Sequence, residues 1–573
     1  MQFKKYSHYA GNLLFWVANF FTLALGMPAT IKNIEAHNPL LGAGDFIAES
    51  LRYPGGILFI ANTALQQLFI SPWIGAAIAA TLTSICACSI GATLRMKQMR
   101  ATSVIGFILA ASILFFEFPD ILQLLQTTLA LLVYCLYSYI RIGKNNTWNW
   151  LPSIFLLVYP VLGTAITFSL YTAMLFHDLI TSRNPRIWVF SALGMILTTF
   201  FSYLWSDYVF YLNEQQRQLF VDNTCHSLIM LIVPFIPLLS ETLLKVANKV
   251  RFSCVEWGIR LLAALMMPLL CMTQKSKIML KENYYAMEQA AESADWHKVY
   301  QLANANTSSY SDFHLRYALL AENEAGTLAD HLFSYPVAST TDLFFWRNTE
   351  KEAAFFNALF YKNIHVADEY MHQIFEMGTQ NHSTTSARAI RHLTEAALMQ
   401  GDMKLAQKYF KIARTSQKDL KWTENIERQL RHHDGLQNTK SIPDRSAFFI
   451  GSYEPKTEFI YTALNDSSNI KRINLMLCSF LLEKDMKRFK QALSIYQKLF
   501  AEHLPEAYTE AYLMANTENK SYSLGFKIPQ NKVKNWVNFL QLLNEDRINE
   551  LTQYYGNSYW YYYLFTDVKP LKE

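Results

Sequence analysis

Charged residues are distributed unevenly along this chain of 573 residues, and this partition limits what the chain can fold into. Residues 1–275 contain 17 Lys or Arg and 11 Asp or Glu, whereas residues 276–573 contain 34 and 35. The first part is poor in charge, and the second resembles a water-soluble protein. This pattern excludes a single soluble globule and a disordered chain. It also excludes a nucleic-acid binder, because the water-facing part has no basic excess.

Apolar segments of the length needed to cross a bilayer recur through the first part. A transmembrane helix needs roughly 20 apolar residues, and the matching segments are 12–30, 73–94, 101–118, 121–140, 187–210, 224–244 and 254–272. Residues 148–181 add either one kinked span or a tight hairpin, because Pro160 and Gly163 interrupt them. The sequence therefore predicts an all-α fold that begins with a polytopic transmembrane bundle of about eight or nine spans.

Basic residues between the apolar segments indicate the orientation. Clusters such as Arg95, Lys97 and Arg100 follow apolar blocks and are expected on the cytoplasmic side. If residues 148–181 form a hairpin, the C-terminal part lies in the periplasm; if they form one span, it lies in the cytoplasm. We expect a multi-pass protein of the bacterial inner membrane with a periplasmic C-terminal domain.

Residues 31–72 are predicted to contain a re-entrant or interfacial segment rather than a full span. The apolar stretch 55–70 is short, and two glutamines interrupt it. Asp45 and Glu49 are four residues apart, so they share one face if this region is helical.

Helical hairpins recur in residues 276–573. The clearest is EAALMQGDMKLAQKYFKIA at 395–413, in which Gly401 and Asp402 form the turn between two helices. Weaker copies occur at 286–303, 319–333, 353–375 and 474–496. One hairpin cannot bury its apolar face alone, so the sequence predicts a stacked, tetratricopeptide-like α-solenoid of roughly five to seven pairs. The domains are expected at 1–275 and 276–573.

The aromatic tail YYGNSYWYYYLF at 554–565 has two interpretations. It forms either a final helix that caps the solenoid or an aromatic surface near the membrane or along a binding groove.

Asp45 and Glu49 are the candidate catalytic residues, because they lie in the first long loop beside the predicted bilayer. A carboxylate there can act as a general base or hold a divalent metal against a lipid-linked diphosphate. The alternative is that both acids are solvated side chains of an interfacial helix. Arg52 shares the loop, and His177 and Asp207 lie at the ends of predicted spans, so these three are candidate substrate-binding residues. No residue is assigned as a metal ligand, and the cofactor is left unknown, with a divalent metal as one alternative.

Two sequence segments carry a family resemblance. NPLLGAGDFIAESLRYPGG and LFISPWIGA, combined with the tetratricopeptide-like C-terminal part, resemble an uncharacterised domain-of-unknown-function family of multi-spanning membrane proteins from Bacteroidota-type bacteria. The resemblance covers most of the chain and implies no activity.

The layout is also similar to that of the GT-C membrane glycosyltransferases, especially the transmembrane and tetratricopeptide-repeat O-mannosyltransferases. That likeness implies a polyprenyl-phosphate-linked sugar donor and acidic catalytic residues in the first outward loop, which Asp45 and Glu49 would match. Those enzymes often carry adjacent acids, whereas the two acids here are four residues apart. The likeness is one of architecture alone.

Two functions follow. The first is a glycosyltransferase of the cell envelope, whose partners are the lipid bilayer, a polyprenyl-phosphate lipid and an acceptor held by the repeats. The second is a non-catalytic membrane scaffold whose repeats recruit protein partners. The number of apolar segments favours the first, because a scaffold needs only one anchoring helix.

Overall fold

The computed structural model is helical in the residues that it describes. It describes residues 2–38, 46–52, 54–96, 102–118, 121–143, 158–181, 185–204, 261–305, 311–346, 350–380, 386–414, 420–434, 455–518 and 524–568. Within these ranges the backbone forms α-helices, short 3-10 helices and connectors, and it forms no strand. The predicted all-α class is therefore confirmed for the part that the structure describes.

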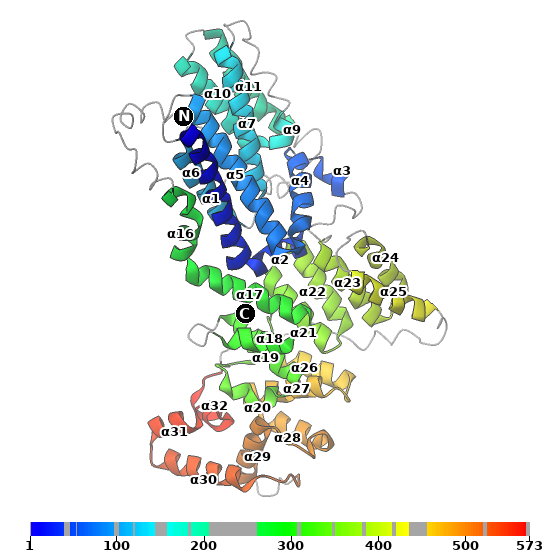
Figure 1. Cartoon of the computed structure of the whole chain (residues 1–573). Helices are drawn as coiled ribbons and strands as arrows, with labels where there is room; N and C mark the ends of the chain where they lie inside the picture. Colours follow the sequence, from blue (N-terminus) through cyan, green and yellow to red (C-terminus); the bar gives the residue numbers. More distant parts are fainter. Residues whose placement is uncertain are drawn as a thin grey trace. The chain divides into compact units, whose positions relative to one another are not determined.

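The chain divides into two compact units, Met1–Glu282 and Asn283–Glu573. The helices of the first unit, shown in Figure 1, are α1 (Gln2–Gly26), α2 (Pro28–His37), α3 (Phe46–Ser50), α4 (Gly56–Gln66), η1 (Gln67–Ile70), α5 (Pro72–Met96), α6 (Thr102–Glu117), α7 (Leu122–Gly143), α9 (Tyr159–Leu162), α10 (Thr164–Thr181), α11 (Pro185–Leu204) and α16 (Met266–Thr273). Helix α17 (Lys275–Glu292) continues from this unit into the second.

Helix α5 is the central helix of the first unit, and it packs against α1, α6 and α7. Small residues make this close packing possible, since Ala76, Ala79 and Ala80 are fully buried. Larger side chains from the surrounding helices, including Phe15 and Phe107, complete the same apolar core.

The predicted bundle of eight or nine spans is wrong. Among the described residues, one helix, Pro72–Ala92, is long and apolar enough to cross a membrane. A second candidate exists only if Ala10–Gly26 and Pro28–His37 count as one span, although they are bent by 80° at Met27. The multi-pass topology and the periplasmic C-terminal domain, which depended on the number of crossings, are therefore not shown.

The physical reason for this error is the length of the apolar segments. The four further apolar helical segments of the described residues, Gly56–Ile70, Val104–Phe115, Leu122–Tyr137 and Ile166–Leu175, are 10–17 residues long. At a rise of about 1.5 Å per residue, 17 residues reach only about 26 Å, less than the roughly 30 Å of hydrocarbon. An apolar count does not reveal where a helix breaks. The predicted span 224–244 lies outside the described residues, and the predicted spans 148–181, 187–210 and 254–272 lie partly outside them.

Two glycines allow the backbone to cross itself closely in the first unit. Gly55 and Gly163 have φ values of 90° and 82°, which strain other residues. The Gly55 N–H donates to the Pro160 carbonyl at 2.9 Å. A Cβ on Gly55 would lie 3.4 Å from the Gly163 Cα. This crossing fixes the start of α4 against the break between α9 and α10.

The second unit is built from short helices joined by tight turns. After the end of α17 they are α18 (Trp296–Asn304), α19 (Asp312–Ala325), α20 (Leu328–His331), η5 (Leu332–Ser334), η6 (Thr340–Asp342), α21 (Lys351–Asn363), α22 (Ala367–Gln380), α23 (Ala387–Gln400), α24 (Met403–Ala413), α25 (Leu420–Asp434), α26 (Pro455–Asn465), α27 (Ile470–Leu482), α28 (Met486–Ile495), η8 (Gln497–Phe500), α29 (Glu506–Glu518), α30 (Gln530–Asn544), α31 (Ile548–Tyr555) and α32 (Tyr559–Phe565).

These helices do not form one continuous stack in sequence order. Helices α21 to α25 stack in sequence order and form one arm. The next helices, α26 to α32, form a second arm that returns to earlier helices, because α27 packs against α19 and α29 packs against α20 (Figure 1). In a simple solenoid each repeat contacts only its neighbours. The second unit therefore has a branched arrangement.

The turn expected at Gly401 and Asp402 is present between α23 and α24. Gly401 adopts a left-handed conformation with φ of 78° and ends α23. Asp402 caps α24, because its side chain accepts a hydrogen bond from the Leu405 N–H at 3.0 Å. Ala406 and Phe410 of α24 then face the core that this arm shares with α25.

Asp402→Ala is expected to lower the free energy of unfolding by about 1 kcal/mol, because the first turn of α24 loses its acceptor. Hydrogen exchange of the α24 amides in the full-length chain measures the effect. Lys404→Ala, an exposed change on the same helix, serves as the control and should shift stability by less than about 0.5 kcal/mol. Equal protection in both variants would contradict the capping role.

Candidate functional site

The structure describes the predicted catalytic and substrate-binding residues only in part. Asp45 and Asp207 lie outside the described residues, as does the side chain of His177 on α10. Glu49 on α3 and Arg52 just after it are exposed, and the Arg52 N–H donates to the Glu49 carbonyl at 3.1 Å. The roles assigned to these five residues stay predictions.

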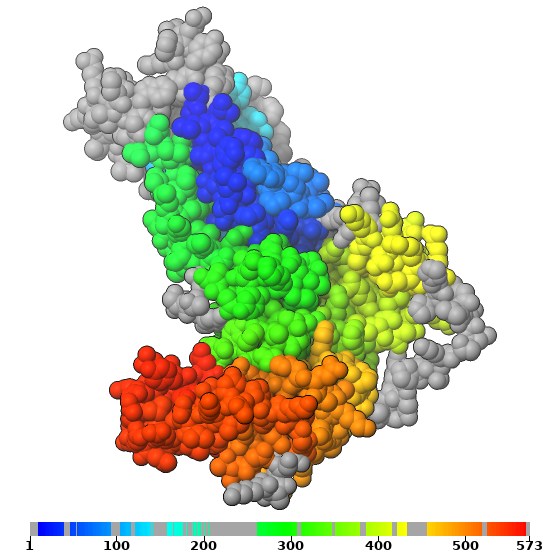
Figure 2. Space-filling model, turned by 60° about the horizontal axis from the view of Figure 1, so that its bottom comes forward, coloured from blue at the N-terminus to red at the C-terminus, as the bar shows by residue number. Residues whose placement is uncertain are grey.

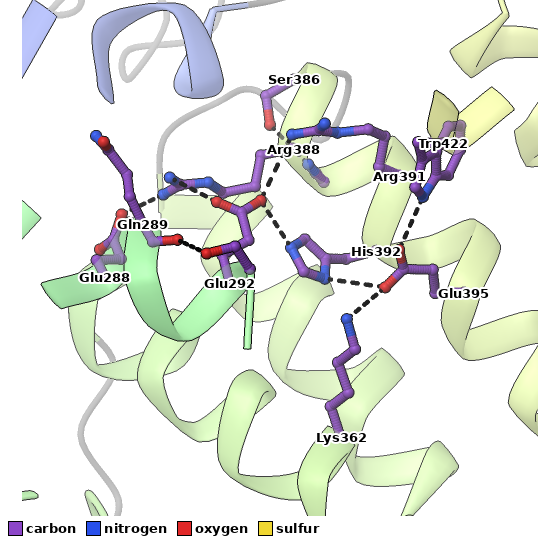
Figure 3. Close-up of polar contacts among 12 residues, drawn as sticks. Glu288, Gln289, Glu292, Lys362, Ser386, Arg388, Arg391, His392, Glu395 and Trp422 are labelled. Carbon is purple, nitrogen blue, oxygen red and sulfur yellow. Dashed lines mark hydrogen bonds and ion pairs between the residues drawn. The ribbon is translucent and has the colours of Figure 1, made fainter. Parts of the chain in front are cut away.

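Acidic, histidine and cysteine side chains do not gather into a metal centre in the described ranges, where no group of three or more of them could hold a metal ion. A cluster of seven ionisable side chains lies instead in the second unit and forms a network of ion pairs. We call it the charge cluster, and its members are Glu288, Glu292, Lys362, Arg388, Arg391, His392 and Glu395 (Figure 3).

Helix periodicity places these side chains together. Four of them follow the i, i+3, i+4, i+7 spacing that aligns residues on one face of α23, namely Arg388, Arg391, His392 and Glu395. Glu288 and Glu292 are four residues apart on α17 and face them. The Ser386 side chain caps α23 by accepting from the Ala389 N–H at 3.1 Å, so this face begins at a fixed position.

Arg388 is the centre of one half of the cluster. Its side chain is 1% exposed, and its two terminal nitrogens pair with different carboxylates. Nη1 contacts Glu288, and Nη2 lies 3.1 Å from Glu292 Oε2. The Tyr284 hydroxyl donates to Glu288 at 3.0 Å, and the guanidinium lies over the Phe355 ring, 4.4 Å from its centroid. These contacts join α17 to α23.

His392 links the two halves. Its Nε2 lies 3.1 Å from Glu292 Oε1, and its Nδ1 contacts the Tyr370 hydroxyl. A carboxylate can only accept, so the neutral imidazole carries its proton on Nε2 and accepts from Tyr370 at Nδ1. Burial lowers the pKa of His392 despite its hydrogen bond to Glu292.

Glu395 completes the other half of the cluster. It accepts from Lys362 Nζ at 2.6 Å and from the Trp422 indole N–H at 2.8 Å. Burial alone would raise the pKa of Glu395, but His392 and Lys362 outweigh it and lower the value. The pKa of Glu292 lies well below its usual range for the same reason, since Arg388 and His392 outweigh its burial.

The charges of the cluster balance one another. Three carboxylates face two arginines, a lysine and a histidine, and each of these groups is paired with another member. Buried pairs of this kind are strongly destabilising to break, because removal of one partner leaves an uncompensated charge. These ion pairs hold α17, α21 and α23 in a fixed register relative to one another.

The comparison with protein families gives a clear result. The model described as "Family of unknown function (DUF6057)" matches residues 4–566. The chain belongs to this family. This confirms the expected membership in an uncharacterised family, and the match covers both units. No curated protein and no solved structure matches the chain.

The sequence analysis missed the charge cluster, although a signal for it existed. Arg388 and His392 are four residues apart on α23, and both are buried. A charged residue at such a position needs a buried partner of opposite sign. Glu288 and Glu292, at matching spacing 100 residues earlier, were the available partners.

Stability is expected to depend on pH through Glu510 of α29, which is 4% exposed. Burial raises its pKa from 4.5 to about 7, although its carboxylate accepts from the Tyr559 N–H at 2.7 Å. The folded protein thus holds a proton that the unfolded chain releases, so this contribution to stability is complete below pH 4.5 and is lost as the pH rises to about 7.

Glu510→Gln keeps an acceptor for Tyr559 and cannot ionise. It should be more stable than the original protein above pH 7, by at most about 3 kcal/mol, and equally stable near pH 4. Denaturant unfolding at both pH values measures the difference between the two proteins. A difference that does not change with pH would rule out this role of Glu510.

Proposed function

We propose that this protein is a membrane-attached scaffold of a bacterial cell envelope, in which the second unit binds a protein partner. One observation carries this proposal. Among the described residues of the second unit, large exposed apolar side chains are most frequent on the second arm, where eleven occur between Tyr461 and Phe565, against two, Tyr300 and Phe375, before it. Exposed apolar groups that cluster on one part of a surface are typical of interaction sites.

Attachment to a membrane is supported by the surface of the first unit. Large apolar side chains are exposed on several of its helices, and examples with at least half of their surface exposed are Leu13, Leu25, Leu136, Ile196 and Leu262. Such a surface is unfavourable in water and favourable in hydrocarbon. Helix α5 is the described helix that best fits a membrane crossing. The bacterial inner membrane is the proposed location.

The most suitable partner surface lies on α28 and η8. Lys487, Gln491, Ile495 and Leu499 follow one another at intervals of four residues, and all are exposed. Ile495 is 73% exposed and Leu499 42%. We call these four residues the α28–η8 surface. Two apolar positions beside a lysine fit a partner helix that carries apolar anchors next to acidic residues.

Neighbouring helices extend this region. Figure 2 shows α28 to α32, in orange and red, side by side on the face in view, and these helices also contact one another in sequence order. Leu464 at the end of α26 is a further exposed apolar residue of the same arm, at 63%. The arm therefore offers more than one anchor position.

Photo-crosslinking in the native host tests the scaffold proposal. A photoreactive residue at Ile495 should give an adduct with one discrete partner, and Ile495→Asp should abolish co-purification of that partner while the circular dichroism spectrum is unchanged. A photoreactive residue at Tyr300, exposed outside the second arm, is the matched control. If no discrete adduct forms at Ile495, or the same adduct forms at both positions, the scaffold proposal fails.

The glycosyltransferase stays a prediction that no contact of the described residues favours. Its likeness to the GT-C enzymes required many spans, and Asp45 lies outside the described residues. A strain with Asp45→Asn tests it directly. Glycoproteins that are unchanged relative to the parent strain would remove this alternative, whereas loss of a glycan would favour it over the scaffold.

A further inference from the structure

Three helices of the first unit reach the same end of that unit. Helix α1 ends at Gly26, α16 ends at Thr273, and α5 begins at Pro72. Helix α1 packs against both α5 and α16, and α2, which follows α1, contacts η1 and α5. Figure 1 shows α2 and α17 at this end of the unit. The chain therefore enters α2 and α17 from one side of the first unit.

A carboxylate joins α17 to α2 at this end. Glu282 of α17 accepts hydrogen bonds from the Thr30 N–H at 3.0 Å and from the Thr30 hydroxyl at 2.8 Å. It also accepts from the Ala29 N–H, so it satisfies the first turn of α2. Glu282 is the only acid among residues 275–282. Its negative charge is therefore directed at the start of α2.

Large apolar side chains are exposed up to this end of the unit. Leu25, one residue before the end of α1, is 65% exposed, and Met272, one residue before the end of α16, is 73% exposed. Trp73, the second residue of α5, is also exposed. Tryptophan is enriched where helices enter the headgroup region of a bilayer. These residues indicate that the hydrocarbon-facing surface ends where α2 and α17 begin.

Exposed lysines follow directly after this apolar surface. We call them the basic rim, and they are Lys32 of α2 and Lys275, Lys277 and Lys281 of α17. Lys32, Lys275 and Lys277 form no ion pair with any residue that the structure describes. Helix α2 is bent by 80° from α1, so it runs across the end of the unit instead of continuing away from it. Lysines without acidic partners therefore lie along the edge of the apolar surface.

We propose that the basic rim binds the headgroups of anionic phospholipids. This inference rests on the membrane attachment proposed above, and it adds the class of lipid and the residues that bind it. Hydrocarbon chains that cover Leu25 and Met272 place the phosphate groups of the same lipids beside the lysines. A lipid matches both the apolar residues and the lysines, whereas an acidic peptide matches only the lysines. Each lysine near an anionic membrane surface strengthens binding by about fivefold.

Spin-labelled lipids measure this preference. The full-length chain is reconstituted in phosphatidylcholine membranes that contain a trace of spin-labelled phosphatidylglycerol or phosphatidylcholine, and the immobilised fraction of each label gives its relative association constant. Phosphatidylglycerol should be preferred, and the preference should fall at high salt because screening weakens exposed charges. Inorganic phosphate should displace the label no better than chloride at the same ionic strength. Equal association of both labels, or specific displacement by phosphate, would overturn the proposal.

Substitutions of exposed lysines locate the site. The double variant Lys275→Gln, Lys277→Gln should lower the preference for phosphatidylglycerol by about fivefold or more. Lys275→Arg with Lys277→Arg keeps both charges and should keep the preference. The matched control is Lys408→Gln with Lys411→Gln, which removes two exposed lysines of α24 in the second unit. If the control or the arginine variant loses the preference to the same degree as the glutamine variant, the basic rim does not bind the headgroups by its charge.

The same reconstitution distinguishes failure of this inference from failure of the proposed membrane attachment. A chain that does not incorporate into the membranes would overturn the attachment and the role of the basic rim together. A chain that incorporates but shows no preference between the two lipids would overturn only the role of the basic rim, because the apolar surface alone then accounts for the attachment.

Discussion

Replacement of Arg388 by methionine will destabilise the second unit by about 3–5 kcal/mol, because it leaves the buried carboxylate of Glu288 without its cation. Glu288 and Arg388 are each 1% exposed, so water cannot replace the lost ion pair. Glu292 keeps Arg391 and His392 as partners, and Glu288 keeps only neutral contacts such as Tyr284. Denaturant unfolding of the full-length chain, followed by hydrogen exchange of α17 and α23, measures the loss.

Two further variants distinguish a loss of stability caused by the buried charge from a loss caused by side-chain packing. Arg547→Met is the matched control, since Arg547 forms ion pairs with Glu545 and Glu550 at the surface, and it should cause no measurable change. The double variant Glu288→Gln, Arg388→Met removes the stranded charge and should recover much of the stability. If the double variant is as unstable as Arg388→Met, the charge of Glu288 is not the cause.

Trp560→Ala will destabilise the same unit by about 3–5 kcal/mol, as is usual for a fully buried aromatic residue. Trp560 is 1% exposed, and its ring lies 5.0 Å from that of Trp536 and 5.6 Å from that of Phe539. Its indole N–H also donates to the Glu510 carbonyl at 2.9 Å. The substitution therefore removes packing between α29, α30 and α32 together with one hydrogen bond.

Tyr554→Ala on α31 is the control for this change, because Tyr554 is 65% exposed. It should alter stability by less than about 0.5 kcal/mol. Both variants are compared by denaturant unfolding, with hydrogen exchange of α30 and α32 as the local measure. A loss of similar size in both would show that Trp560 does not anchor the end of the chain.

The sequence predicted the features that depend on local pattern. An all-helical chain follows from the apolar periodicity and the scarcity of glycine, and the turn at Gly401 and Asp402 follows from the chemistry of helix ends. For the aromatic tail, burial of Tyr559 and Trp560 in a final helix favours the cap over the exposed aromatic surface.

Features that depend on helix breaks and distant contacts were not predictable in the same way. An apolar stretch looks continuous in sequence, whereas the backbone bends by 80° after Gly26 and breaks at Gly163. The branched arrangement of the second unit was also hidden, because α19 and α27 meet through residues far apart in the chain. Composition predicts whether a segment prefers lipid or water, but it does not predict where each helix ends.

The candidate functional sites likewise could not be identified from the sequence alone. Sequence reasoning selected acids in a loop, because exposed polar residues near a predicted membrane suggest chemistry. The charge cluster lies instead where α17 meets α23, and its members pair only when those two helices are in contact. A pattern within one helix does not identify the partner helix.

The late return of α27 to α19 has a consequence for synthesis on the ribosome. Lys471 of α27 pairs with Glu324 of α19 at 2.6 Å, although the two residues are 147 positions apart in the chain. Glu324 is nearly buried in the finished protein, so its helix cannot be covered until the ribosome has produced the second arm. During that interval the nascent chain exposes the surface of α19 that α27 later covers.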